Sequence, residues 1–150
     1  MDFMKNRVLI VDDSSSWLMF HKTLIEELYG NLFELTFAHS AEEAYSLVIQ
    51  NSDNPFNMII TDMQMEMKYD VEAGEWLIQR VQELRKYFAC KIVIISGIYN
   101  IQAIANKYNV DCISKSILIN NKLLMKFLFE KLMPFLTKID WFLLENLFQI

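Results

Sequence analysis

Residues 8–14 have the sequence Val-Leu-Ile-Val-Asp-Asp-Ser, in which a short apolar run is followed at once by two carboxylates. A continuous run rich in β-branched residues is typical of a strand that is covered on both faces, as in a parallel sheet. Four more strand candidates follow, at residues 33–38, 57–61, 91–95 and 110–113. The chain has only 3 glycines and 2 prolines, which argues against a sandwich with many Gly- and Pro-rich turns.

Segments with a helical period alternate with these strands, at residues 14–29, 41–50, 73–88, 101–108 and 121–132. The third segment has one apolar face, formed by Leu77, Val81, Leu84 and Phe88. Ser40 and Glu43 have the spacing of a capping box, which predicts a helix start at Ala41. Five strands that alternate with five helices predict an α/β fold with a doubly wound, five-stranded parallel sheet.

We expect one domain over residues 1–133, followed by a C-terminal extension helix over residues 134–150. Pro134 has no amide donor and therefore ends the preceding helix. The extension carries a wide apolar stripe, formed by Leu136, Ile139, Leu143, Leu147 and Ile150. Such a stripe either folds back on its own domain or packs against another chain or a further domain. A linker or a dimerisation helix is therefore expected, with a homodimer as the assembly.

Composition and charge exclude several classes of protein. With 14 Lys and Arg against 19 Asp and Glu, the formal net charge is −5, which disfavours direct binding to nucleic acid and to anionic membranes. The longest apolar runs span four residues, whereas a membrane span needs about 20. Residues 1–7 lack the pattern of a secretion signal, and Cys90 and Cys112 lack metal-ligand spacing, so we expect a cytoplasmic protein with reduced thiols. His21 and His39 have no motif partner and are expected to be structural or exposed.

Three carboxylates follow two of the strand candidates. Asp12 and Asp13 come directly after the first strand, and Asp62 comes directly after the third. The carboxyl ends of central parallel strands meet at one rim, so these side chains are expected to crowd together. Such a cluster needs a counter-cation, and its hard oxygen ligands suit Mg²⁺.

Two further strand ends bring complementary groups to the same rim. Ser96 ends the fourth strand, and Lys115 follows the fifth. A hydroxyl and an ammonium opposite an acidic metal site suit a phosphoryl group, whose charge is spread over three oxygens. We therefore expect transfer of a phosphoryl group to Asp62, which would act as the nucleophile and form an acyl phosphate.

Taken in order, residues 8–14, Asp62, the Ile-Ile-Ser-Gly run at 94–97 and the pair Ser114-Lys115 resemble the motifs of a known family. That family is the receiver domain of bacterial two-component response regulators, the CheY-like fold. The resemblance covers about residues 5–132 and depends on four motifs that occur in the same order. It implies a sheet of order 2-1-3-4-5 and a receiver domain over residues 1–133.

The resemblance also implies how the acidic residues divide their roles. Asp62 is implied to be the phosphoacceptor. Asp13 and Asp62 are implied to ligate Mg²⁺ directly, with Asp12 acting through water. The backbone carbonyl of Gln64 is implied to be a further ligand.

Ser96 and Lys115 are implied to be the switch pair that senses the phosphoryl group. The phosphodonor is implied to be a sensor histidine kinase or a phosphotransfer protein. The output is a changed contact with a downstream effector domain or protein. Such a domain is not an enzyme, since it accepts a phosphoryl group on itself and at most releases it slowly.

Four positions depart from the pattern of that family. Glu66 stands where a proline usually follows the phosphoacceptor, and Gly74 comes later than the usual glycine, so the loop at 63–73 is longer. Ser116 replaces the proline after the lysine, and Cys112 replaces the aromatic switch residue. We therefore predict intact phosphoryl chemistry with an altered readout.

Three other functions are possible for a chain with this pattern of strands and helices. A phosphorylation-independent pseudo-receiver scaffold would keep the fold, with Glu66, Ser116 and Cys112 as marks of relaxed switching. A phosphohydrolase would need a second acid–base group beside the nucleophile, where this chain has Gln64. A Rossmann nucleotide binder would need a glycine-rich loop after the first strand, and residues 12–17 contain no glycine.

Overall fold

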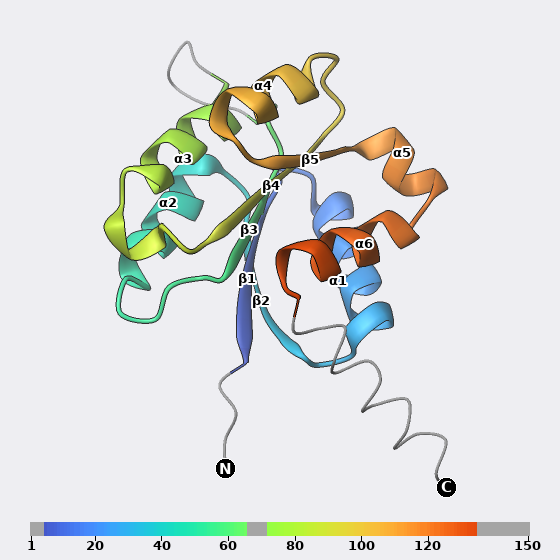
Figure 1. Cartoon of the computed structure of the whole chain (residues 1–150), viewed down its shortest axis with the longest axis horizontal. Helices are drawn as coiled ribbons and strands as arrows, with labels where there is room; N and C mark the ends of the chain where they lie inside the picture. Colours follow the sequence, from blue (N-terminus) through green and yellow to red (C-terminus); the bar gives the residue numbers. More distant parts are fainter. Residues whose placement is uncertain (1–4, 66–71, 135–150) are drawn as a thin grey trace, which may run out of the picture.

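Five parallel strands form one sheet in the computed structural model, which describes residues 5–65 and 72–134 (Figure 1). The strands are β1 (Asn6–Val11), β2 (Phe33–Ala38), β3 (Met58–Thr61), β4 (Lys91–Ser96) and β5 (Asp111–Ser114). Their order across the sheet is β2-β1-β3-β4-β5, and every pair is parallel. The predicted doubly wound sheet of order 2-1-3-4-5 is therefore confirmed.

Helices cover both faces of this sheet (Figure 1). One face carries α2 (Ala41–Gln50), α3 (Ala73–Gln82) and α4 (Ile101–Tyr108), and the other carries α1 (Ser15–Tyr29), α5 (Lys115–Asn120) and α6 (Leu123–Leu132). Along β1, Leu9 and Val11 belong to the core beneath α2–α4, while Val8 and Ile10 belong to the core beneath α1, α5 and α6. Because both sides of each strand are buried, the strand sequences are continuous apolar runs.

The helix predicted over residues 73–88 is wrong at its C-terminal end. Helix α3 ends at Gln82, Leu84 has an extended backbone (φ −90°, ψ 118°), and a short 3-10 helix, η1 (Arg85–Tyr87), follows. Phe88, expected on the buried face, is 71% exposed. Tyr87 is buried instead, and its hydroxyl donates to Val48 O on α2 at 2.8 Å. This contact with a distant helix outweighs the local apolar period.

The C-terminal helical region also differs from the expectation. Helix α5 was not predicted, and the helix predicted over 121–132 begins only at Leu123. The short α5 has no period long enough to identify from sequence, and Leu118 is its single buried residue. Residues 135–150 of the expected extension, and Glu66, lie outside the described residues.

The predicted capping box at α2 is confirmed. The amide of Glu43 donates to Ser40 Oγ at 3.0 Å, and the Glu43 carboxylate accepts a bond from the amide of His39 at 2.9 Å. Among residues 5–65 and 72–134, no helix combines the length and the apolar character that a bilayer crossing requires.

His21 is a histidine buried inside the core of the α1 face. Its side chain packs against Trp17 and Phe20, with ring centroids 5.7 and 5.9 Å away, and the residue is 1% exposed. Its Nδ1 atom has no hydrogen-bond partner among the described residues. Burial, and to a smaller extent the positive charge of Lys115, together lower the pKa of His21 to about 4, while the negative charge of Asp62 acts in the opposite direction. The imidazole is therefore neutral in the folded protein at pH 7.

Acid should destabilise the protein through His21. Between pH 6.5 and 4 the unfolded chain binds a proton at this residue and the folded protein does not, so stability falls as the pH falls through this window. We expect His21→Leu to reduce the stability loss between pH 7 and pH 5 by about 2 kcal/mol. Urea unfolding at both pH values measures this difference.

His39 provides the matched control, because its side chain is 59% exposed. His39→Gln should not reproduce the effect of His21→Leu, because burial is the largest cause of that effect. An equal loss of stability in the native chain and in His21→Leu would contradict the assignment to His21.

Candidate functional site

Two buried carboxylates lie at the carboxyl ends of neighbouring strands. Asp12 directly follows β1, and its amide still donates to Ala38 O on β2 at 3.1 Å. Asp62 directly follows β3, and its amide donates to Val11 O on β1 at 3.0 Å. Asp12 is 2% exposed and Asp62 is 5% exposed, whereas Asp13 is exposed. The sheet ladder thus fixes the backbone of both buried aspartates.

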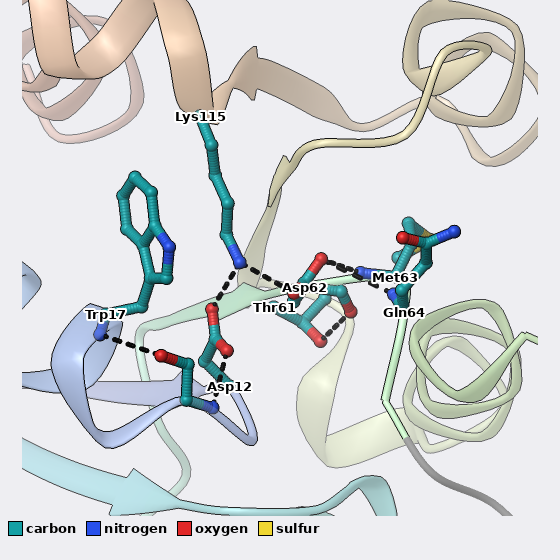
Figure 2. A network of polar contacts seen from close by, with 8 residues as sticks. Asp12, Trp17, Thr61, Asp62, Met63, Gln64 and Lys115 are labelled. Carbon is teal, nitrogen blue, oxygen red and sulfur yellow. Dashed lines mark hydrogen bonds and ion pairs between the residues drawn. The ribbon is translucent and has the colours of Figure 1, made fainter.

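Backbone amides hold one oxygen of each buried carboxylate (Figure 2). Asp12 Oδ1 accepts a bond from the amide of Ser14 at 2.9 Å. Asp62 Oδ1 accepts bonds from the amides of Met63 at 2.7 Å and Gln64 at 3.4 Å. These bonds set the orientation of the two side chains and leave the other oxygen of each carboxylate for a cation.

That cation is the ammonium of Lys115, the first residue of α5. Its Nζ lies 2.8 Å from Asp12 Oδ2 and 2.8 Å from Asp62 Oδ2, and Figure 2 shows the side chain between the two carboxylates. Burial disfavours the charge of Lys115, but the bonds to both carboxylates outweigh burial and raise the pKa of the ammonium. Burial also raises the pKa of Asp12, more than Lys115 and the Ser14 amide lower it.

The carboxylates outnumber the single ammonium at this rim. Asp12, Asp13 and Asp62 each offer an oxygen, and these oxygens lie within 4.8 Å of one another. One lysine offsets one of three formal charges, so the remaining charge matches a divalent cation. A set of carboxylate oxygens with open positions is what Mg²⁺ prefers, so the residues present fit this ion. Ligation by the carbonyl of Gln64 stays a prediction.

Ser96 ends β4 at the same edge of the sheet and is fully buried. Its hydroxyl has no hydrogen-bond partner among the described residues. A buried hydroxyl without a partner costs free energy, and such groups in native proteins call for an explanation. An oxygen-rich group bound at the rim would give Ser96 the partner that it lacks.

Gly74 in the first turn of α3 lies directly behind the phosphoacceptor candidate. A Cβ built at this position would overlap Asp62 O and the Met63 side chain and would lie 2.8 Å from Met63 Cα. The Gly74 amide also donates to Met63 O at 3.2 Å. Only glycine lets α3 pack this closely against the backbone that carries Asp62. The sequence identified Gly74 as a late glycine but not as the residue that allows this packing.

The residues expected to carry the readout lie around α4. Cys112, which is half-buried on β5, has its Sγ 3.5 Å from Gln102 Oε1 on α4. On the other flank of α4, the Tyr108 hydroxyl donates to Glu75 Oε1 on α3 at 2.5 Å. Helix α4 is therefore linked by side chains to both neighbours. Ser116 Oγ lies 3.0 Å from Ser114 Oγ at the start of α5.

Trp17 is a rim residue that the sequence did not identify. It lies in the first turn of α1, where its amide donates to Ser14 Oγ at 3.3 Å, and its indole lies beside the Lys115 side chain (Figure 2). No local pattern predicts this contact, because an aromatic residue in a first helical turn is more often part of a core.

Comparison with known proteins gives structural neighbours only. No family model matches this chain, and no curated protein matches it in sequence. A CheY-like response regulator receiver domain protein from Methanospirillum hungatei is similar, with 25% sequence identity and a TM-score of 0.64 over 86% of this chain and 94% of that one. The phosphorylated cyanobacterial phytochrome response regulator RcpA has a TM-score of 0.70 at 14% identity, over 85% of this chain and 93% of that one.

The chemotaxis response regulator CheY4 of Vibrio cholerae is also similar, with a TM-score of 0.58 and 19% identity over 73% of this chain and 84% of that one. All three structures match most of their own length with this chain. The strand order, the helices on both faces and these structural matches together show that the chain has the receiver-domain fold of CheY-like response regulators.

Proposed function

We propose that this chain is a two-component receiver that accepts a phosphoryl group on Asp62 in a reaction that requires Mg²⁺. The observation that carries the proposal is the arrangement of Asp62 itself. Its carboxylate is buried, one oxygen accepts backbone amides, and the other meets Lys115 beside the carboxylates of Asp12 and Asp13. The donor is a sensor histidine kinase or a phosphotransfer protein, and the setting is cytoplasmic.

In the transfer, an oxygen of Asp62 attacks the phosphorus of a phosphohistidine. The new O–P bond forms as the N–P bond breaks, and the donor imidazole leaves with the electron pair of that bond. Mg²⁺ held by Asp13, Asp62 and the Gln64 carbonyl, with Asp12 acting through water, would neutralise charge on the phosphoryl oxygens. Lys115 balances the remaining negative charge, and the Met63 and Gln64 amides keep the Asp62 carboxylate oriented.

The readout begins with Ser96 and Lys115. After transfer, the Ser96 hydroxyl and the Lys115 ammonium pair with phosphoryl oxygens, which gives Ser96 its missing partner. Both residues lie at strand ends, so their movement reaches the helices that follow β4 and β5. The contact of Cys112 with Gln102 offers a route from β5 to α4 in place of a rotating aromatic ring. The output is a changed protein contact that biases a pre-existing equilibrium.

A phosphorylation-independent scaffold is the second candidate. The observation that favours it is Cys112, whose small side chain at the switch position is already bonded to α4. In that case, partner binding would not depend on the state of Asp62. A test for phosphorylation of Asp62 therefore distinguishes the receiver from the scaffold.

The native chain should gain one phosphoryl group when it is incubated with acetyl phosphate and Mg²⁺. We expect Asp62→Asn to gain none, because the amide nitrogen is not a nucleophile, and chelation of Mg²⁺ to abolish the adduct in the native chain. Intact mass spectrometry measures the adduct directly.

Asp53→Asn is the matched control, since the Asp53 side chain is fully exposed and pairs with Lys86 at 3.1 Å away from the rim. This variant should form the adduct at the native rate. If neither acetyl phosphate nor a phosphorylated histidine kinase modifies the native chain, the scaffold becomes the better assignment.

Gly74→Ala should slow the same reaction and destabilise the protein. The added methyl group overlaps the backbone of Asp62 and Met63, so this backbone or the start of α3 must shift, which disturbs the position of the Asp62 carboxylate. Overpacking of this kind costs about 1–3 kcal/mol, which urea unfolding detects. Gly97→Ala is the control for stability, because a Cβ there meets nothing within 4 Å. Equal effects of the two variants on stability would contradict this account.

We also propose that the chain forms a homodimer through α5 and α6. Four apolar residues on these helices are more than half exposed: Ile117, Ile119, Leu123 and Phe127. Several large apolar side chains exposed on two consecutive helices favour burial against another protein surface.

The full chain is therefore expected to sediment as a dimer, and the double variant with Leu123→Glu and Phe127→Glu as a monomer, because buried charge at the interface is unfavourable. Phe88→Glu is the control, since Phe88 is more exposed than either of these residues but lies after η1 and not on α5 or α6. A native chain that is monomeric in sedimentation equilibrium would end this proposal.

A further inference from the structure

Lys115 has a third contact besides the two carboxylates. Its Nζ lies over the indole of Trp17, 4.7 Å from the ring centroid, and Figure 2 shows the ring alongside the lysine side chain. An ammonium at this distance over an indole face is attracted by the electron-rich face of the neutral ring. Lys115 is only 15% exposed, so the contact is poorly screened by water.

Phosphoryl transfer affects the two ion pairs of Lys115 but leaves its contact with Trp17 in place. Phosphorylation turns one oxygen of Asp62 into part of an acyl phosphate, and a cation at the rim competes with Lys115 for Asp12. Both ion pairs of Lys115 therefore change during the reaction. An aromatic face is not a ligand for a hard cation, so the Trp17 contact is the one that survives each step.

Neighbouring residues on α1 fix the position of the Trp17 indole beside Lys115. Its backbone belongs to the capped first turn of α1, where Ser14 Oγ accepts the Trp17 amide at 3.3 Å. On the same helix, the rings of Phe20 and His21 pack against it with centroids 5.1 and 5.7 Å away. The amide of the same Ser14 binds Asp12, so one turn positions both the carboxylate and the ring.

We propose that Trp17 is a positioning residue that keeps the Lys115 ammonium at the rim while its carboxylate partners are occupied. The inference rests on the proposed phosphorylation of Asp62. Lysine has a flexible four-carbon stem, so without the indole it would sample positions away from the phosphoryl oxygens. The effect of Trp17 is therefore on the rate of transfer and not on the affinity for the donor.

The first test measures phosphorylation of the full chain by acetyl phosphate over a range of donor concentrations. We expect Trp17→Leu to lower the maximal rate about 3- to 30-fold, with an unchanged half-saturating concentration. Trp17→Phe keeps an aromatic face and should recover most of the rate. Trp76→Leu is the matched control, because Trp76 contacts Arg80 and Tyr45 away from Lys115. Native rates in Trp17→Leu would overturn the proposal.

The second test observes the contact without relying on turnover. Protons of the Lys115 ε-methylene group lie near the indole face, and the ring current should shift their NMR resonance upfield. The resonance is identified by its absence in Lys115→Met. We expect the shift in the native chain to persist after addition of Mg²⁺ and the phosphoryl mimic beryllofluoride, and to disappear in Trp17→Leu.

The two tests separate failure of this inference from failure of the proposed function. If the native chain forms no acyl phosphate from any donor, phosphorylation of Asp62 is wrong, and the role of Trp17 in the rate of transfer is wrong with it. The resonance then decides only whether Trp17 holds Lys115 while Mg²⁺ occupies the carboxylates. A shift that persists with Mg²⁺ then supports a contact independent of the carboxylates. A shift that is lost on adding Mg²⁺, or that is equal in native and Trp17→Leu chains, overturns it.

Discussion

The ammonium of Lys115 neutralises two buried carboxylates, and the fold brings these three groups together from distant parts of the chain. Asp12, Asp62 and Lys115 each follow a different parallel strand. Lys115 Nζ lies 2.8 Å from a carboxylate oxygen of each aspartate. Buried charges of one sign are unfavourable unless a cation is at hand. The sheet order and the register of its strands therefore determine whether the rim can exist at all.

The features that the sequence predicted are those with a local signal. Apolar runs followed by Asp12, Asp62 or Lys115 indicated both the strands and the rim, because strands buried on two faces must be apolar throughout. The predicted end of α3 was wrong because a contact between Tyr87 and Val48 outweighs the apolar helical period of residues 77–88. The contact of Lys115 with Trp17 joins segments far apart in the sequence, and the packing of Gly74 behind Asp62 depends on how α3 docks after the loop, so no local pattern encodes either of them.

The rim and the surface around α4 depart from the family pattern to different degrees. At the rim, the carboxylates, the hydroxyl of Ser96 and the ammonium all lie at the expected strand ends. Around α4, the aromatic residue is replaced by Cys112, and side chains from β5 and α3 bind the helix on both flanks. A helix linked in this way moves only if one of these bonds breaks. Movement of α4 after the proposed phosphorylation therefore requires that one of these hydrogen bonds break.

Because Lys115 comes late in the chain, the stability of the first and third strands depends on the docking of the last one. A chain folded only through β4 contains Asp12 and Asp62 on adjacent strands without the ammonium that neutralises them. Such an intermediate is destabilised by like charges in a buried setting, and it recovers only when β5 and α5 dock. We therefore expect docking of the last strand to stabilise the first and third strands, although each βα connection is local in sequence.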